Sequence, residues 1–490
     1  MELDFRETPL SYLQTVLWET VTQEETIETI VPDAMPDVET VTDGFALACL
    51  RSRDCQDGTL SLSGDIQGGI LYMAQGEDTP RMLSIYAPFS LRRPAPEAEQ
   101  CCITCRVTQV DATLRNSRKV SIRITLCLHV QAWKQQEEAL FTPGEPLVPM
   151  QFREYPMTLL GECTQKELLL RETAPQSGAQ RVLHTAGWVQ MQEEKLAGSQ
   201  GICKGELQLQ ILFSDMEDKL QTQEFSLPFS QVIDLSDDYE TDTGLWITPV
   251  LTALDCTVQG DSFAVEAGLC LQACAYHSVM VPVVADAYAL QGELTLDRRE
   301  YGMVPELEHR RLHQELHQSL PINAAEILHA QAMPDAPKCT WADGAYQIQI
   351  PVQLSLCYRD TEGAVRLSKE TGQVSVTVPG AKGQLQLTAV PCGTCFAAPM
   401  GGGVEVRQTI CLSCCFLGEE RLSTICGGEY QPSDVQEERP CLIVRTLTQD
   451  TELWTLAKEL RTTVSAIAIA NDMDGDTAPA GTMLLIPIVA

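Results

Sequence analysis

The sequence predicts a mainly β multidomain protein, with three tandem β-rich, sandwich-like repeats and a small C-terminal α+β domain. Three observations lead to this fold class. Apolar and polar residues alternate with period two in runs such as ELQLQILF and YQIQIPVQLSLCY, which is typical of half-buried strands. Two blocks of sequence recur about 140 residues apart. Near the C-terminus the pattern changes to apolar residues at helical spacing.

The first recurring block is clearest in two copies. SGDIQGGILYMAQGEDTPRMLSIYAPFS (63–90) aligns with KGELQLQILFSDMEDKLQTQEFSLPFS (204–230), so that Gly64 matches Gly205, Tyr72 matches Phe213, and P-F-S ends both. A third copy, YQIQIPVQLSLCYRDTEG (346–363), lacks the glycine and is the most divergent. Because their spacing is kept, we expect the first two copies to be structural equivalents.

The second recurring block follows each copy of the first. VTQVDAT, LTALDCT and LTAVPCGT align, and each leads into an apolar strand: IRITLCLHV, VEAGLCLQACAY or VRQTICLSCCF. A unit of about 145 residues is therefore present three times. The predicted division is an N-terminal segment at 1–28, repeats at 29–165, 166–325 and 326–426, a linker at 427–440 and a small domain at 441–490.

The net charge of the chain and its N-terminal sequence exclude several classes of function. The chain has 67 acidic and 34 basic side chains, a formal net charge of -33. Such a surface repels phosphate backbones and anionic lipids, so neither nucleic-acid binding nor membrane insertion is expected. MELDFRETPLSYLQ has no apolar signal core, and no apolar run reaches the roughly 18 residues of a membrane span. We therefore expect a cytoplasmic protein whose 20 cysteines are reduced thiols.

The stretch CGTCFAAPMGGGVEVRQTICLSCC holds C-x-x-C twice, at the spacing of a four-thiolate zinc site. The repeats favour a different interpretation. Cys411 aligns with Cys270 and Cys127, as expected of a buried strand position that suits a small thiol. Residues three apart on a strand also point to opposite faces. We therefore predict strand packing and no metal site, and read MGGGVEV as a hairpin turn.

No catalytic constellation stands out. VPELEHRRLHQELHQSL (304–320) is expected to form a connecting helix with His309, His313 and His317 on one face. A zinc protease would need a glutamate after the first histidine of its motif, and this chain has Gln314 after His313. Nucleotide-binding and serine-hydrolase motifs are also missing from the sequence. The chain is expected to be no enzyme and to need no cofactor.

The last fifty residues predict a compact strand–helix–helix–strand domain. CLIVRTL (441–447) forms the first strand, and ELWTLAKEL (452–460) forms a helix capped by Asp450 or Thr451. Thr463 caps a second helix, VSAIAIA (464–470), and LLIPI (484–488) forms the last strand.

This segment resembles a LysM domain, through Leu453-Trp454, Ala470-Asn471-Asp472-Met473 and Leu485-Ile486-Pro487. The upstream repeats resemble the SPOCS domain of spore-coat assembly proteins, through VPDAMPDVETV (31–41), the I-L-Y strand, the P-F-S ending and ADAYAL (285–290). Such repeats before a terminal LysM domain resemble the clostridial family of spore-coat morphogenetic proteins that bind stage IV sporulation protein A. The resemblance implies a scaffold in the mother-cell cytoplasm, at the forespore surface.

One departure bears on the ligand. The G-D-T opening of the LysM pattern falls on Asp450-Thr451-Glu452, so a glycine is lost and carboxylates are added where the family binds N-acetylglucosamine polymers. We therefore expect a protein partner with a basic patch, with peptidoglycan binding as the alternative and self-association of the repeats also open. The predicted partner-binding residues, in two loops, are Gln449, Asp450, Thr451, Glu452, Asn471, Asp472, Met473, Asp474, Ala480 and Gly481.

Overall fold

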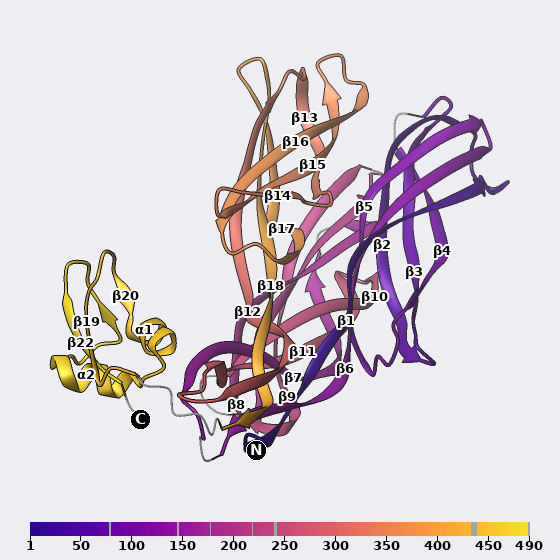
Figure 1. Cartoon of the computed structure of the whole chain (residues 1–490). Coiled ribbons are helices and arrows are strands. Elements are labelled where there is room, and N and C mark those ends of the chain that lie inside the picture. Colours follow the sequence, from indigo (N-terminus) through magenta and orange to yellow (C-terminus); the bar gives the residue numbers. More distant parts are fainter. Residues whose placement is uncertain are drawn as a thin grey trace.

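The computed structural model describes residues 1–77, 80–144, 147–176, 178–217, 219–239, 243–432 and 439–488. Within these residues the chain consists of antiparallel strands and two short helices, which confirms the mainly β multidomain class. Figure 1 shows long-stranded units and a small C-terminal module beside them. The middle of the predicted linker, 433–438, lies outside the described residues. Neither helix of the described chain has the length and apolar character needed to cross a membrane.

Unit one (residues 5–143) is a sandwich of two three-stranded sheets, with strand orders β1-β6-β5 and β2-β3-β4. Residues 5–28, expected ahead of the first repeat, pair with β6 and belong to its first sheet. The strands are β1 (Phe5–Ile30), β2 (Val38–Gln56), β3 (Thr59–Ala74), β4 (Pro80–Pro94), β5 (Gln100–Asn116) and β6 (Lys119–Pro143).

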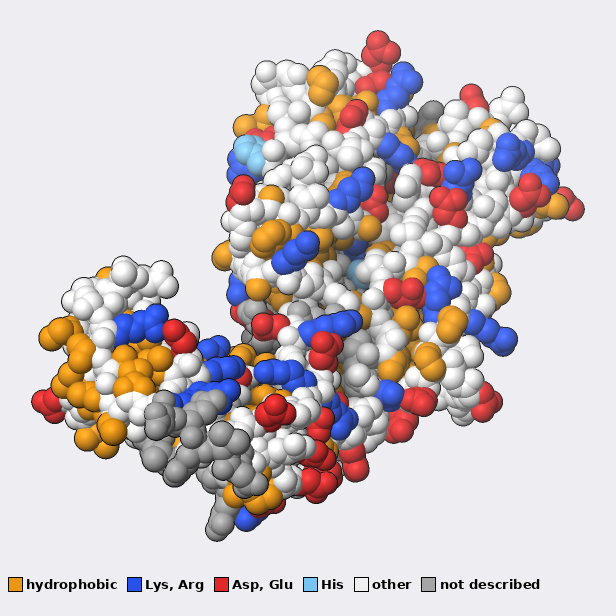
Figure 2. Space-filling model, in the orientation of Figure 1, with side chains coloured by type: hydrophobic (Ala, Val, Ile, Leu, Met, Phe, Trp, Pro, Cys, Tyr) orange, Lys and Arg blue, Asp and Glu red, His pale blue; other side chains and the backbone are white. Residues whose placement is uncertain are grey.

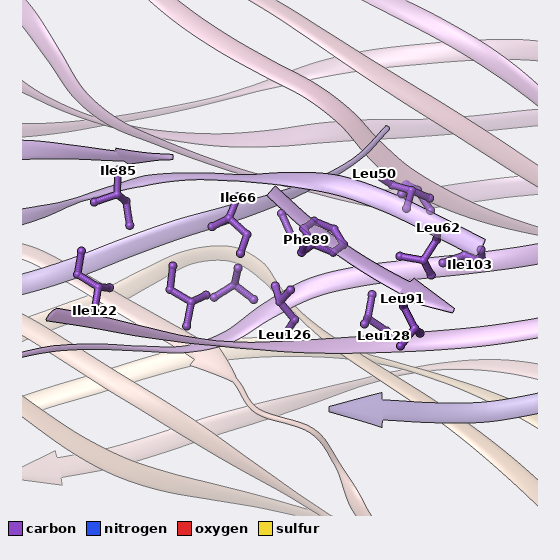
Figure 3. Close-up of a cluster of buried hydrophobic side chains, with 14 of the residues drawn as sticks. Leu50, Leu62, Ile66, Ile85, Phe89, Leu91, Ile103, Ile122, Leu126 and Leu128 are labelled. Atoms are coloured by element: carbon purple, nitrogen blue, oxygen red, sulfur yellow. The ribbon is translucent and has the colours of Figure 1, made fainter. Parts of the chain in front are cut away.

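Alternation along the strands builds the core of unit one. Every second residue of β3 and β6 points inward, so Ile66 on one sheet and Ile122 and Leu126 on the other are fully buried. Figure 3 shows these side chains filling the space between the sheets, with the ring of Phe89 among them. Period-two patterning, the basis of the fold-class prediction, therefore sets this core.

Unit two (residues 150–287) repeats the arrangement with fewer strands. One sheet has the order β10-β11-β7, and the second consists of β8 and β9. The strands are β7 (Met150–Pro175), β8 (Ala179–Asp215), β9 (Leu220–Tyr239), β10 (Gly244–Gln259) and β11 (Ser262–Ala287).

Unit three (residues 293–431) has one sheet of order β12-β18-β17 and a second of order β13-β15-β14, in which β16 also pairs with β15. The predicted MGGGVEV turn is confirmed, because Gly401 and Gly402 have positive φ between β17 and β18. The strands are β12 (Glu293–Leu320), β13 (Ala324–Pro334), β14 (Lys338–Ala342), β15 (Ala345–Asp360), β16 (Val365–Pro379), β17 (Gln384–Met400) and β18 (Gly403–Gln431).

The predicted helix at 304–320 is wrong, because these residues form the second half of β12. Residues four apart share a face in a strand as well as in a helix, so the histidine spacing alone did not distinguish the two. His309 stacks on Trp246 at 5.3 Å between ring centroids, and His317 bonds Glu405 at 2.6 Å. Pairing with β18 places this segment at the edge of a three-stranded sheet. This tertiary contact overrides the helical propensity of the segment and cannot be read from the local sequence.

The first recurring block occupies matching places in units one and two. Gly64 on β3 lies opposite Phe89 on β4, and Gly205 on β8 lies opposite Phe229 on β9. A Cβ on Gly64 would lie 2.4 Å from the Phe89 ring, and one on Gly205 would lie 2.7 Å from the Phe229 ring. Both glycines therefore make room for an aromatic ring that lies across the neighbouring strand.

The aligned cysteines also occupy matching places. Cys127, Cys270 and Cys411 lie on β6, β11 and β18, the central strands of the three three-stranded sheets. All three are buried, at 1%, 0% and 6% exposure. Cys414, three residues after Cys411, points into the core of unit three. Among the described residues no group of three or more His, Cys, Asp or Glu side chains is arranged to hold a metal ion.

The three units meet through these three-stranded sheets. Leu13 and Trp133 of unit one, Leu160, Trp246 and Cys274 of unit two and Cys415 of unit three form one apolar cluster. Buried polar groups cross the same junction. The side-chain amide of Gln272 accepts from the Ile103 N–H and donates to the Ile103 carbonyl, both at 2.9 Å.

Candidate functional site

The C-terminal module (residues 441–488) has the predicted strand, two helices and strand in that order, and adds two short strands, β20 (Thr451–Glu452) and β21 (Thr477–Ala478), that were not predicted. The other elements are β19 (Leu442–Thr446), α1 (Leu453–Leu460), α2 (Val464–Asn471) and β22 (Met483–Pro487). The amphipathic face of α1 buries Leu453, Leu456 and Ala457 against Leu484 and Ile486 of β22.

One of the two predicted helix caps is confirmed. The Thr463 hydroxyl accepts from the Ala466 N–H at 3.2 Å at the start of α2. The prediction that Asp450 or Thr451 caps α1 is wrong, because Glu452 occupies the cap position and makes no capping bond with its side chain. Strand β20 pairs with β21 directly before α1, so residues 450 and 451 lie too early in the chain to cap it.

The structure brings the two predicted loops together at one end of the module. Asp450 accepts from the Ala480 N–H at 2.8 Å, and Gly481 donates to the Leu447 carbonyl at the same distance. Thr451 lies opposite Ala478. Gln449, Glu452 and Gly481 are exposed there. Asp450 is therefore part of the framework that joins the loops as well as part of their surface.

The predicted residues from 471 to 474 divide into internal and exposed groups. The Asn471 side chain donates to the carbonyls of Ile467 and Leu485 and accepts from the Leu485 N–H at 2.7 Å, so it fastens α2 to β22. Met473 packs against the module core. Asp472 ends α2 in the left-handed conformation, with φ of 53°, which aspartate tolerates. Asp472 and Asp474 expose their carboxylates to solvent.

One side of the module contacts unit two and the connector after it. The Tyr288 ring meets the Trp454 ring edge-on at 4.9 Å between centroids, and the Tyr288 hydroxyl donates to the Thr462 carbonyl at 2.5 Å. Asp286 accepts from the Trp454 indole at 3.0 Å and from Lys458 at 2.6 Å. This contact surface, made by Asp286, Tyr288, Trp454 and Lys458, is called the latch below.

The charge of Asp286 depends on the latch. Burial alone would raise the pKa of Asp286, but hydrogen bonds from Lys458 and Trp454 outweigh burial and hold this pKa below its ordinary value of 3.8. A lowered carboxyl pKa means that the stabilisation is complete above pH 3.8 and is lost as the pH falls through the lower value of the folded state. The latch is therefore insensitive to pH throughout the neutral range.

A substitution tests the latch. We expect Asp286→Asn to release the module and to raise the radius of gyration in small-angle X-ray scattering, because a neutral amide cannot pair with Lys458. Wild type should give one radius from pH 5.5 to pH 8. The exposed Asp297→Asn serves as the control and should leave the radius unchanged. An Asp286→Asn variant as compact as wild type would contradict this role.

The opposite side of the module exposes an apolar face that the sequence reading missed. Successive outward residues of β19 and β22, with one residue of α2, form it: Leu442, Val444, Ile469, Met483 and Leu485. Ile469 is 82% exposed and Val444 is 56% exposed. Figure 2 shows hydrophobic side chains gathered over this module. Val444 and Leu485 are directly paired across β19 and β22, and exposed apolar side chains gathered in this way mark an interaction surface.

The signal for this apolar face was present in the sequence. The first three residues of LIVRT and all residues of MLLIP are apolar, yet a two-stranded sheet can bury only one of its faces. The inward residues Leu484 and Ile486 fill the core, which leaves Val444 and Leu485 outside. The number of apolar residues in these two strands exceeds what one buried sheet face can hold, and this excess predicts an exposed apolar face.

Comparison with known proteins bears on the units. Residues 179–259 match the family model described as SipL, SPOCS domain. The matched range begins where β8 begins and ends where β10 ends, so it corresponds to whole structural elements of unit two. No curated protein and no solved structure matched the chain. Unit two is therefore similar to a SPOCS domain over these residues, and the match supports a sporulation-related role for the chain.

Proposed function

We propose that this chain is a non-enzymatic scaffold in assembly of the bacterial endospore coat. In this proposal it acts in the mother-cell cytoplasm at the forespore surface. Its LysM-like C-terminal module docks a coat morphogenetic protein that resembles stage IV sporulation protein A. The observation that carries the docking role is the exposed apolar face of the module, at Leu442, Val444, Ile469, Met483 and Leu485.

The arrangement of the module supports this role. The latch already occupies one side of it, through Trp454 and Lys458. The outer face of β19 and β22 and the joined loops remain exposed. Residues 441–488 contain six acidic and three basic side chains, a net charge of -3. An apolar patch beside acidic loops suits a partner whose own apolar patch is bordered by basic residues.

We also propose that units one and three are relatives of the SPOCS unit. Unit one supports this through the Gly64 and Phe89 pairing, which has the same register as Gly205 and Phe229 in unit two. Unit three supports it through the central strand β18, whose Cys411 occupies the place of Cys270 on β11. The three would then offer repeated surfaces for assembly.

Docking is tested by placing charge on the apolar face. The double variant Val444→Asp, Leu485→Asp should weaken binding of the full-length chain to the purified morphogenetic protein at least tenfold, because two buried carboxylates would lose their water. Both side chains point outward, so the module should stay folded. The matched control places aspartates at the exposed Met216 and Val232 of unit two and should bind as wild type does.

Two outcomes would overturn the docking proposal. One is wild-type affinity in the Val444→Asp, Leu485→Asp variant. The other is saturable binding of N-acetylglucosamine oligomers that the same variant abolishes, which would favour the glycan alternative. Charge reversal at Glu452 and Asp474 tests the loops separately. It should slow association and reduce the dependence of the association rate on salt, while Asp450, which joins the loops, is left intact.

A further inference from the structure

A pocket of about 240 Å³ lies where the three units meet, and the proposed function makes no use of it. Unit one contributes β2, β5 and β6, unit two contributes β8 and β10, and unit three contributes β12, β13, β17 and β18. Most of the lining is apolar. It includes Val107, Trp188, Met191, Trp246, Met333 and Val390. A mostly apolar pocket with a few polar groups is the usual character of a small-molecule site.

Three lining side chains carry buried polar atoms for which the described residues provide no hydrogen-bond partner. They are the Thr104 hydroxyl, Arg106 Nε and Trp188 Nε1. Each such atom costs roughly 1–3 kcal/mol if it stays unpaired. All three can donate a hydrogen bond. A ligand that satisfies them needs acceptor atoms.

Arg106 sets the charge of that ligand. Its Nη1 donates to the carbonyls of Pro334, at 3.2 Å, and Ala389, and its Nη2 donates to the Asp335 carbonyl at 3.1 Å. These carbonyl partners are uncharged. The Asp335 carboxylate acts on the guanidinium from a distance, but it forms no ion pair with Arg106. Nε has no hydrogen-bond partner among the described residues, and the Cys127 thiol lies beside the guanidinium. A buried cation that forms no direct ion pair and keeps a donor without a partner favours an anionic ligand.

The histidines of the pocket, the thiol beside Arg106 and the second arginine do not neutralise this charge. Burial lowers the pKa of His129, His184 and His309 to about 3, so all three are neutral at physiological pH. Burial also raises the pKa of Cys127 beside the guanidinium, so the thiol is not an anion. Arg311 is neutralised by two bonds to Glu194, both at 2.8 Å. Of the two arginines that line the pocket in the described part of the chain, Arg106 is therefore the one without an ion pair.

The volume sets the size of the ligand. An apolar cavity of about 150 Å³ accommodates benzene, with its six carbon atoms. By the same ratio, a pocket of about 240 Å³ accommodates roughly ten non-hydrogen atoms. We propose that the pocket binds a small monocarboxylate of this size, whose carboxylate pairs with Arg106 and whose apolar chain or ring lies among Trp188, Met191 and Trp246.

Octanoate and phenylacetate are suitable probes, since each has ten non-hydrogen atoms and one carboxylate. Isothermal titration of the full chain with each probe should show saturable binding of one molecule per chain. Octanol and octylammonium share the apolar chain without the negative charge, and should bind at least tenfold more weakly. The proposal is overturned if neither carboxylate binds the folded chain, or if octanol binds as tightly as octanoate.

Variants distinguish the role of Arg106 in binding the carboxylate from its role in holding the units together. Arg106→Met should weaken octanoate binding at least tenfold, while the exposed Arg92→Met should leave it unchanged. Because Arg106 also joins units one and three through carbonyls, the methionine variant could fail to fold. Ser413→Leu narrows the pocket from β18 without removing a donor to another unit, and should abolish binding while circular dichroism stays that of wild type. Wild-type octanoate affinity in either folded variant would refute the site.

Discussion

Gly205→Val is expected to destabilise unit two by roughly 2–4 kcal/mol. The Cβ of the new side chain would lie 2.7 Å from the Phe229 ring and 2.9 Å from the Gln190 carbonyl oxygen. The ring can turn only into a filled core, and the carbonyl belongs to backbone, so neither can yield cheaply. Urea denaturation followed by hydrogen–deuterium exchange of peptides from β8 and β9 measures the loss in the unit concerned.

The control for Gly205→Val lies in another strand. Gly302 on β12 has no heavy atom within 4 Å of the place its Cβ would take. Because valine favours extended backbone, Gly302→Val should be neutral or slightly stabilising. Equal effects of the two substitutions would show that the strand, and not the ring across it, determines the need for glycine. Gly64→Val should destabilise unit one at least as much, since its Cβ would lie 2.4 Å from both the Phe89 ring and the Cys49 carbonyl oxygen.

Gln272→Met should have the largest effect on how the units hold together. This side chain is 1% exposed and forms two hydrogen bonds with the backbone of Ile103, on the free edge of β5. The side-chain amide of Gln272 thus makes the two backbone hydrogen bonds that a neighbouring strand would make with Ile103. Methionine keeps the shape but leaves the N–H and carbonyl of Ile103 buried and unpaired, at a cost of roughly 2–5 kcal/mol.

The readout for Gln272 is the cooperativity of unfolding. Units one and two should unfold at separate denaturant concentrations in Gln272→Met and together in wild type, as judged by exchange of peptides from β5 and β11. Gln373→Met, at an exposed position on β16, should leave unfolding unchanged. A single transition at the wild-type midpoint in Gln272→Met would show that the apolar cluster around Trp133 and Trp246 holds the units without this bond.

The sequence predicted those features that depend on local pattern. Period-two alternation and turn glycines gave the mainly β class, and the two helices of the C-terminal module followed from helical spacing and from the Thr463 cap. It failed for β12, where Glu, His, Leu and Arg favour helix and only pairing with β18 makes them a strand. The pocket also escaped it, because Arg106, Trp188 and Met333 come from three units whose contact no local pattern encodes.

The candidate site was predicted in part for the same reason. Motif matching placed the two loops, and the bond between Asp450 and Ala480 shows that they do lie together. It could not show that the Asn471 amide is used inside the module, nor that Trp454 faces Tyr288, since both depend on atoms far away in sequence. Whether these loops bind a partner stays a prediction.

The latch also determines how a mechanical load would travel through the chain. The C-terminal module follows unit three in sequence, yet its contacts at Asp286 and Tyr288 lie before unit three begins. A pull between a partner held by the module and the first two units would therefore pass directly across the latch. Unit three would lie outside the load path for as long as the latch holds, and would be stretched only after the bonds of Asp286 and Tyr288 had broken.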